Sequence, residues 1–86
     1  MGNMATVKIY STTWCSFCRA EKRWLDSAGI KYDSVDVEAD EAAAHEMVHL
    51  SGQMGVPFTL ITKDDGTKVG VVGFDQPHLA AELGLK

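Results

Sequence analysis

Cys15 falls where one periodicity in the sequence gives way to another. Residues 6–10 alternate apolar and polar side chains, a pattern typical of a half-buried strand. From Ser16 onward the apolar residues recur at helical spacing, and Gly29 follows the last of them, where a helix end favours a residue that tolerates positive φ. The apolar set is Phe17, Ala20, Trp24, Leu25 and Ala28. We therefore expect a strand, a short junction, and an amphipathic helix that buries this set.

The remainder of the chain continues this alternation. A second strand is predicted at residues 32–37, and a helix at 41–50 with Asp40 as its N-cap and Gly52 near its end. Strands are expected at 58–62 and 68–72, on either side of an Asp-Gly pair that favours a tight hairpin.

A short last helix is predicted after Asp75, with Pro77 in its first turn and Gly84 after its end. The order is then β-α-β-α-β-β-α. It predicts an α/β fold with a four-stranded mixed sheet flanked by three helices, in which a right-handed crossover makes the first two strands parallel.

The length of 86 residues suits one small domain, so residues 1–86 are expected to form one unit with residues 1–4 as a flexible tail. The net charge of −4 disfavours nucleic acid as a partner. Apolar runs fall far short of the ~20 residues that span a bilayer, which predicts no membrane association. Two cysteines and no secretory leader favour a cytoplasmic location.

The spacing of Cys15 and Cys18 indicates redox chemistry. At a helix start, backbone N–H groups lack intrahelical partners and the helix dipole is positive, so a thiolate at Cys15 is stabilised. Cys18, one turn later on the same side, is placed to attack a mixed disulfide on Cys15 and release the product. Basic residues near this helix favour an anionic species there if they face the cysteines, and are otherwise solvated charges: Arg19, Lys22, Arg23 and Lys31.

A zinc site is the alternative use of the cysteines, with His45 and His49 completing four ligands. The 26 residues between Cys18 and His45 far exceed the ~12 of a typical finger, so no metal is expected. Residues 45–49 also match the H-E-x-x-H pattern of zinc proteases, but a third ligand and a substrate cleft are not evident. We expect two solvent-facing histidines opposite a buried stripe that includes Met47 and Leu50.

Three segments together resemble the glutaredoxins: W-C-S-F-C at 14–18, G-V-P at 55–57 and G-F-D at 73–75. The resemblance is to the short bacterial glutaredoxin-like and mycoredoxin-like branch. It implies a thioredoxin-like fold and a dithiol-disulfide oxidoreductase that reduces protein or low-molecular-weight thiol mixed disulfides. It further implies that Cys15 is the nucleophile, that Cys18 is the resolving thiol, and that the Val56-Pro57 peptide bond is cis and faces Cys15.

The same resemblance implies a thiol-binding groove beside Cys15. Its other residues would be Phe17, Val56, Pro57, Gly73 and Asp75. Glutathione or mycothiol would act as reducing co-substrate, pairing with the Val56 backbone while the start of the last helix holds a carboxylate. The implied partners are small thiols and disulfide-containing proteins, with no tightly bound cofactor and a monomeric protein.

The sequence departs from the glutaredoxin pattern at two places. Ser16 and Phe17 replace the common Pro-Tyr pair, and in the wider family loss of that proline sometimes accompanies iron-sulfur cluster binding by a glutathione-linked dimer. Phe74 replaces the second glycine of the element that clamps the glutathione carboxylate, and either narrows the approach or plugs the space beneath the last helix. Two alternatives therefore stay open: a glutathione-dependent iron-sulfur cluster carrier, and a redoxin electron donor reduced by thioredoxin reductase.

Overall fold

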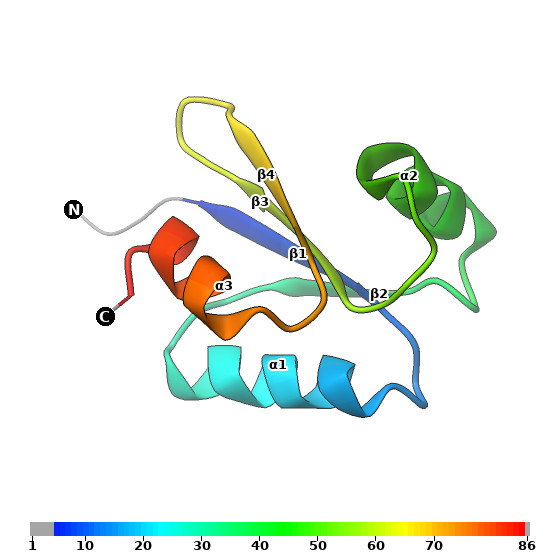
Figure 1. The fold of residues 1–86 in the computed structure, drawn as a ribbon, viewed down its shortest axis with the longest axis horizontal. Coiled ribbons are helices and arrows are strands. Elements are labelled where there is room, and N and C mark those ends of the chain that lie inside the picture. Colours follow the sequence, from blue (N-terminus) through cyan, green and yellow to red (C-terminus); the bar gives the residue numbers. More distant parts are fainter. Residues whose placement is uncertain (1–4, 86) are drawn as a thin grey trace.

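The computed structural model describes residues 5–85, and its elements follow the predicted order (Figure 1). The strands are β1 (Thr6–Ser11), β2 (Asp33–Asp36), β3 (Phe58–Thr62) and β4 (Lys68–Val72). The helices are α1 (Ser16–Ser27), α2 (Glu41–Ser51) and α3 (Gln76–Leu83). The tail predicted at residues 1–4 lies outside the described residues. None of the helices in the described part is long and apolar enough to cross a membrane.

The four strands form one mixed sheet in the order β2-β1-β3-β4. β1 pairs in parallel with β2, and β3 pairs antiparallel with both β1 and β4. The parallel pair follows from the crossover through α1, and the antiparallel edge follows from the hairpin whose turn contains Gly66 at φ +88°. The mixed sheet and the thioredoxin-like fold predicted from the sequence are confirmed.

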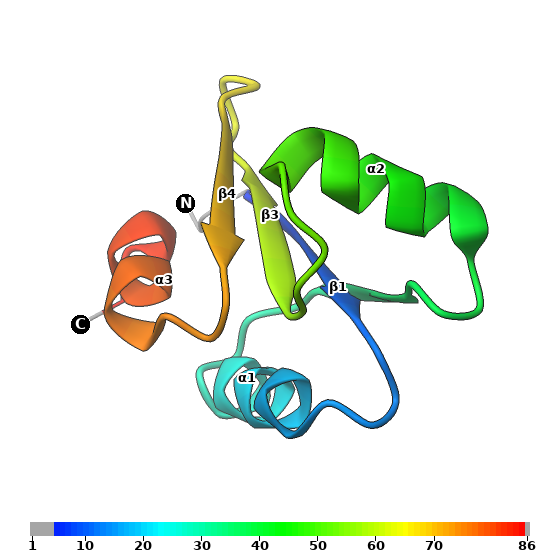
Figure 2. The ribbon, with the colours of Figure 1, turned by 45° about the vertical axis from the view of Figure 1, so that its right-hand side comes forward.

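Helices cover both faces of the sheet, unequally. α1 and α3 lie on one face and α2 lies alone on the other (Figure 2). The first face holds the larger apolar cluster: Val7, Ile9, Leu25, Ile61, Val71, Leu79 and Leu83. The α2 face holds a smaller one: Tyr10, Ala43, Met47 and Phe58. Alternate residues of β1 and of β3 thus serve two cores of different size.

The helix ends confirm the predicted caps. Asp40 accepts a hydrogen bond from the Ala43 backbone N–H, and Asp75 accepts one from the His78 N–H at 3.2 Å. Gly52 adopts the left-handed conformation, with φ of +72°, that ends α2.

The face that α1 buries differs from the predicted one. Cys18, Glu21 and Leu25 are buried, whereas Phe17 is 68% exposed and Ala28 is exposed. Of the predicted set, Leu25 is buried and Trp24 packs against the apolar cluster, so the prediction is right for these two residues and wrong for Phe17 and Ala28. The sheet receives the face that carries Cys18, which turns the aromatic ring of Phe17 outward. Leu50 of α2, predicted to be buried, is likewise exposed, while Met47 is buried as predicted.

Candidate active site

Cys15 is the N-cap of α1, and the backbone of the following turn points at its sulfur. The Cys18 backbone N–H donates a hydrogen bond to Cys15 Sγ at 3.1 Å. Cys15 itself has an extended backbone conformation, with φ of −83° and ψ of 111°, so the chain turns into the helix at this residue. This arrangement stabilises negative charge on Cys15 Sγ, because an N–H dipole and the positive helix end both face it.

The two thiols differ in their exposure to solvent. Both are free cysteines, but Cys18 is fully buried, whereas Cys15 keeps 7% of its surface exposed. Burial raises the pKa of Cys18 to about 12, and the neighbouring Cys15 sulfur adds to the rise. Cys18 therefore stays protonated at neutral pH, and Cys15 is the more accessible of the two thiols. The lesser exposure expected for Cys18 is confirmed.

The loop before β3 faces Cys15. The Val56-Pro57 peptide bond is cis, as predicted. Cys15 Sγ donates a long hydrogen bond, 3.9 Å, to the Val56 carbonyl oxygen. The Gly73 N–H donates to the Pro57 carbonyl at 2.8 Å, which joins the end of β4 to the same loop. Three segments distant in sequence therefore meet beside the reactive sulfur.

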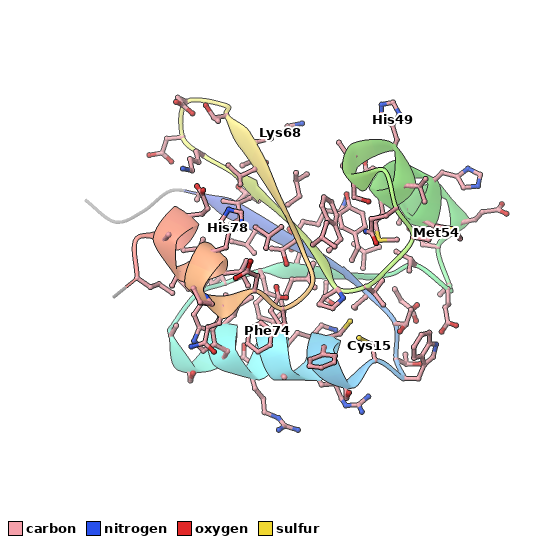
Figure 3. The ribbon with its side chains drawn as sticks, in the orientation of Figure 1. Cys15, His49, Met54, Lys68, Phe74 and His78 are labelled. Atoms are coloured by element: carbon pink, nitrogen blue, oxygen red, sulfur yellow. The ribbon has the colours of Figure 1, made fainter. Side chains whose placement is uncertain are left out.

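A cavity of about 680 Å³ opens beside Cys15 on the α2 side. It includes Phe17 and Val56 of the predicted groove, but Pro57, Gly73 and Asp75 are outside its lining. Most of its wall consists of residues that the sequence analysis did not connect with the site: Thr12, Trp14, Ser16, Val37, Glu38, Ala44, Met47, Val48, Met54 and Gly55. Figure 3 labels Met54 on the loop after α2 and Cys15 at the start of α1.

Phe74 lies on the face of the sheet that α1 and α3 cover. Its ring packs against Trp24 of α1, with 6.0 Å between the ring centroids, and against the apolar cluster under α3. Figure 3 places Phe74 over α1, further along that helix than Cys15. Of the two roles that the sequence left open for Phe74, the structure supports the hydrophobic plug. Asp75 caps α3, so one of its carboxylate oxygens is already occupied by the His78 N–H.

The basic side chains near α1 do not line the cavity, although Lys22 is close enough to oppose the rise in the Cys18 pKa. Arg19 donates from Nη1 to the Thr13 carbonyl at 2.8 Å and so braces the loop before Cys15. Lys31 follows the far end of α1, where it borders a different hollow with Ala5 and Tyr32. No lysine, arginine or histidine of the described chain lines the cavity.

Glu21 is a buried charge-bearing group that the sequence analysis missed. The Thr59 hydroxyl donates to Glu21 Oε2, while Oε1 is buried without a hydrogen-bond partner among residues 5–85. Burial raises the pKa of the Glu21 carboxyl above its usual range. The spacing of Glu21 from Cys18 and Leu25 places it on their helix face, and that spacing was the one sign in the sequence of its burial.

The histidines of the H-E-x-x-H pattern are exposed on α2, as predicted. Within residues 5–85, no three His, Cys, Asp or Glu side chains gather as a metal ion would need.

Comparison with known proteins agrees with this geometry. The Glutaredoxin family model matches residues 7–64. A glutaredoxin from Neisseria meningitidis serogroup A is 42% identical over 84 residues, which cover 95% of this chain and 93% of the relative. Mycoredoxin 1 of Corynebacterium glutamicum is 48% identical over 40 residues, 46% of this chain and 48% of that protein.

Solved structures show the same fold. A crystal structure of a thioredoxin-like protein superposes with a TM-score of 0.79 at 22% identity, covering 94% of this chain and 97% of that one. The crystal structure of a buckwheat glutaredoxin-glutathione complex gives a TM-score of 0.70 at 24% identity, covering 95% and 76% of the two chains.

Proposed function

Because the chain belongs to the glutaredoxin family and is therefore a thiol-disulfide oxidoreductase, we propose that Cys15 is its attacking thiol and Cys18 its resolving thiol. The observation that carries this proposal is the contrast within one helical turn. Cys15 Sγ accepts the Cys18 N–H at 3.1 Å and borders a cavity, whereas Cys18 is buried with its pKa raised to about 12.

The reaction proceeds in two exchanges. The Cys15 thiolate attacks a substrate disulfide; one S–S bond forms, the other breaks, and the leaving thiolate takes a proton from water. Cys18 then releases its proton and attacks Cys15 Sγ, which forms the Cys15–Cys18 disulfide and frees the second substrate thiol. The protein loses two electrons, and the substrate disulfide becomes two thiols. An external thiol donor returns the two electrons.

The first exchange makes Cys18 easier to deprotonate for the second. Desolvation is the main cause of the raised Cys18 pKa, but the adjacent Cys15 sulfur contributes as well. Once Cys15 is bonded to substrate, it no longer carries negative charge beside Cys18. Deprotonation of Cys18 then costs less, so the resolving thiol becomes active when there is a mixed disulfide to resolve.

For the reductant we propose a small thiol such as glutathione or mycothiol. The groove expected for it joins Cys15 to Phe17, Val56, Pro57, Gly73 and Asp75. The cis bond at Pro57, the Cys15–Val56 contact and the Gly73–Pro57 hydrogen bond support the central part of this groove. The Asp75 carboxylate at its α3 end already accepts the His78 N–H and repels a second carboxylate, so we expect weaker glutathione use than in a glutaredoxin with two glycines there.

Substitution of each cysteine tests the proposal. Cys15→Ser should abolish disulfide reduction, because no other thiol reaches the substrate. Cys18→Ser should keep part of the activity on glutathione-type mixed disulfides, where an external thiol resolves the intermediate. The rates would be measured with glutathione, mycothiol and thioredoxin reductase as alternative electron donors. Activity that survives in Cys15→Ser would contradict the assignment.

The choice of electron donor and a reconstitution experiment separate the rival functions. Efficient turnover with thioredoxin reductase and none with small thiols would identify a redoxin. Visible absorbance after anaerobic reconstitution, with a dimer on gel filtration, would favour the iron-sulfur carrier. A monomeric state and a cytoplasmic location stay predictions.

A further inference from the structure

We propose that the cavity on the α2 side of Cys15 is a subsite for an apolar side chain of a polypeptide, so that extended protein disulfides are preferred over glutathione disulfides. This inference rests on the proposed function, because it assigns a substrate class to the disulfide that Cys15 attacks. The cavity is bounded by Trp14, Phe17, Val48, Met54 and Val56, and we refer to it below as the α2-side cavity.

Large apolar side chains form much of the wall of the α2-side cavity. Trp14 and Met54 are 66% and 80% exposed, yet both are large apolar side chains at the rim of one hollow that also reaches Cys15. Exposed apolar residues gathered around a concave site mark a surface that another molecule covers, and Trp and Met are enriched where proteins bind proteins. An apolar group that enters this hollow would be surrounded mainly by apolar side chains.

The charge around the α2-side cavity is negative. The one charged residue in the lining is an acid, Glu38, and the adjoining segment adds Asp36, Asp40 and Glu41. Glutathione carries two carboxylates, and within the described lining no cationic side chain is available to receive one. A carboxylate placed there would lose hydration and meet negative charge. A neutral or basic polypeptide segment meets neither penalty.

The backbone groups of Val56, beside the Cys15 sulfur, are available to a substrate. No hydrogen bond within residues 5–85 uses the Val56 N–H, and the Val56 carbonyl accepts only the long contact from Cys15. An extended segment can pair with both groups as an added strand does. In such a segment, side chains two residues apart point the same way. When the substrate cysteine faces Cys15, the residue two positions along the segment therefore faces the α2-side cavity.

The test uses single-turnover oxidation of the reduced protein, so that no particular reductant is required. The oxidants are symmetric disulfide dimers of a ten-residue peptide with a central cysteine, and glutathione disulfide. One peptide carries Leu two positions to each side of the cysteine, and the other carries Asp there. Samples are quenched by alkylation and quantified by mass spectrometry, and each rate is normalised to the rate with bis(2-hydroxyethyl) disulfide, a small uncharged oxidant.

We expect the Leu dimer to oxidise the protein at least tenfold faster than either the Asp dimer or glutathione disulfide, a difference of about 1.4 kcal/mol. Met54→Ser should slow the Leu dimer about fivefold. Val48 and Leu50 form a matched pair on α2, because they are 39% and 42% exposed but only Val48 lines the cavity. Val48→Ser should therefore slow the Leu dimer severalfold, and Leu50→Ser should leave its rate unchanged.

The outcomes separate the two proposals. Equal normalised rates for the Leu and Asp dimers, or equal effects of Val48→Ser and Leu50→Ser, would overturn the α2-side cavity as a side-chain subsite and leave the oxidoreductase assignment intact. If the folded wild-type protein is oxidised by none of the three disulfides, the proposed function itself fails.

Discussion

The two sides of Cys15 are built differently. On the α2 side the site is open, apolar and free of basic groups within the described lining. On the α3 side the Phe74 ring rests on Trp24, and Asp75 already accepts a hydrogen bond from its own helix. One reactive sulfur therefore faces two environments, and substrate choice depends on which of them a ligand must enter.

The difference arises from how the helices cover the sheet. α1 and α3 share one face, and their side chains close over a cluster that also takes in Phe74. α2 covers the opposite face alone, and its buried contribution is limited to Ala43 and Met47. The end of that face nearest Cys15 is left to the exposed side chains of Val48 and Met54.

The largest effect that we predict is a loss of stability when the α3 side of the site is opened at Phe74. Phe74→Gly removes a half-buried ring from the α1–α3 junction, and should cost about 2 kcal/mol of unfolding free energy because it leaves a cavity. Phe17→Ala is the control, since that ring is exposed and its loss should cost far less. Urea denaturation of both variants measures the contrast. Equal losses would show that the α3 side is not closed by packing.

Changing the charge on the closed side should have a smaller effect. Asp75→Asn keeps an N-capping side chain but removes a negative charge from the expected carboxylate site. We expect the rate with glutathione disulfide to rise about twofold and to depend less on salt, because repulsion at short range is relieved. Asp64→Asn makes the same change of charge in the exposed turn between β3 and β4, which lines a different hollow, and should not alter that rate. A fall in rate for Asp75→Asn would mean that Asp75 assists the small thiol.

Two glutamates, one on each face of the sheet, should respond to pH with opposite sign. Burial raises the Glu21 pKa, so between the unfolded value of 4.5 and the higher folded value the unfolded chain releases a proton that the folded protein keeps. Stability is therefore lost as pH rises through this window. Glu21→Gln removes the loss and should be more stable than wild type at pH 7.

For Glu46 on α2 the pKa shift, and hence the dependence of stability on pH, has the opposite sign. Hydrogen bonds from Tyr10 and Lys8 lower its pKa, so its contribution is present above the unfolded value of 4.5 and is lost as pH falls through the folded pKa. Glu46→Gln should therefore be less stable than wild type at pH 7, by a small amount because this side chain is partly exposed. Thermal unfolding from pH 3 to pH 8 measures both variants. A stability change of the same sign in Glu21→Gln and Glu46→Gln would contradict the opposite pKa shifts of the two carboxyls.

Local patterns in the sequence predicted most of the fold. The bounds of β3 and β4 and the caps at Asp40 and Asp75 agree with the structure. The cis Val56-Pro57 bond also agrees, but the resemblance to the glutaredoxins implied it. The position of Cys15 at the start of α1 was predicted as well, because a strand-to-helix change is visible in the periodicity alone.

What the sequence did not predict depends on contacts between distant segments. Part of the buried face of α1 was misjudged because Phe17 and Ala28 fit helical spacing as well as Cys18 and Glu21 do, and only contact with the sheet decides which residues are buried. The lining of the α2-side cavity comes from four separate segments, with Thr12 and residues 14–17, residues 37–38, Ala44 and residues 47–48, and residues 54–56, which no single periodicity relates. Burial of Glu21 was missed because a charged residue is expected to face water.

The most direct test of the account is the pH dependence with which each cysteine of the reduced protein reacts with iodoacetamide, resolved by peptide mass spectrometry. Cys15 should be labelled at pH 7. Cys18 of the folded protein should stay unlabelled until the pH approaches its pKa of about 12. Labelling in a denaturant is the control, in which both thiols should react alike. Labelling of Cys18 before Cys15 in the folded protein would contradict the assignment of the attacking and resolving thiols.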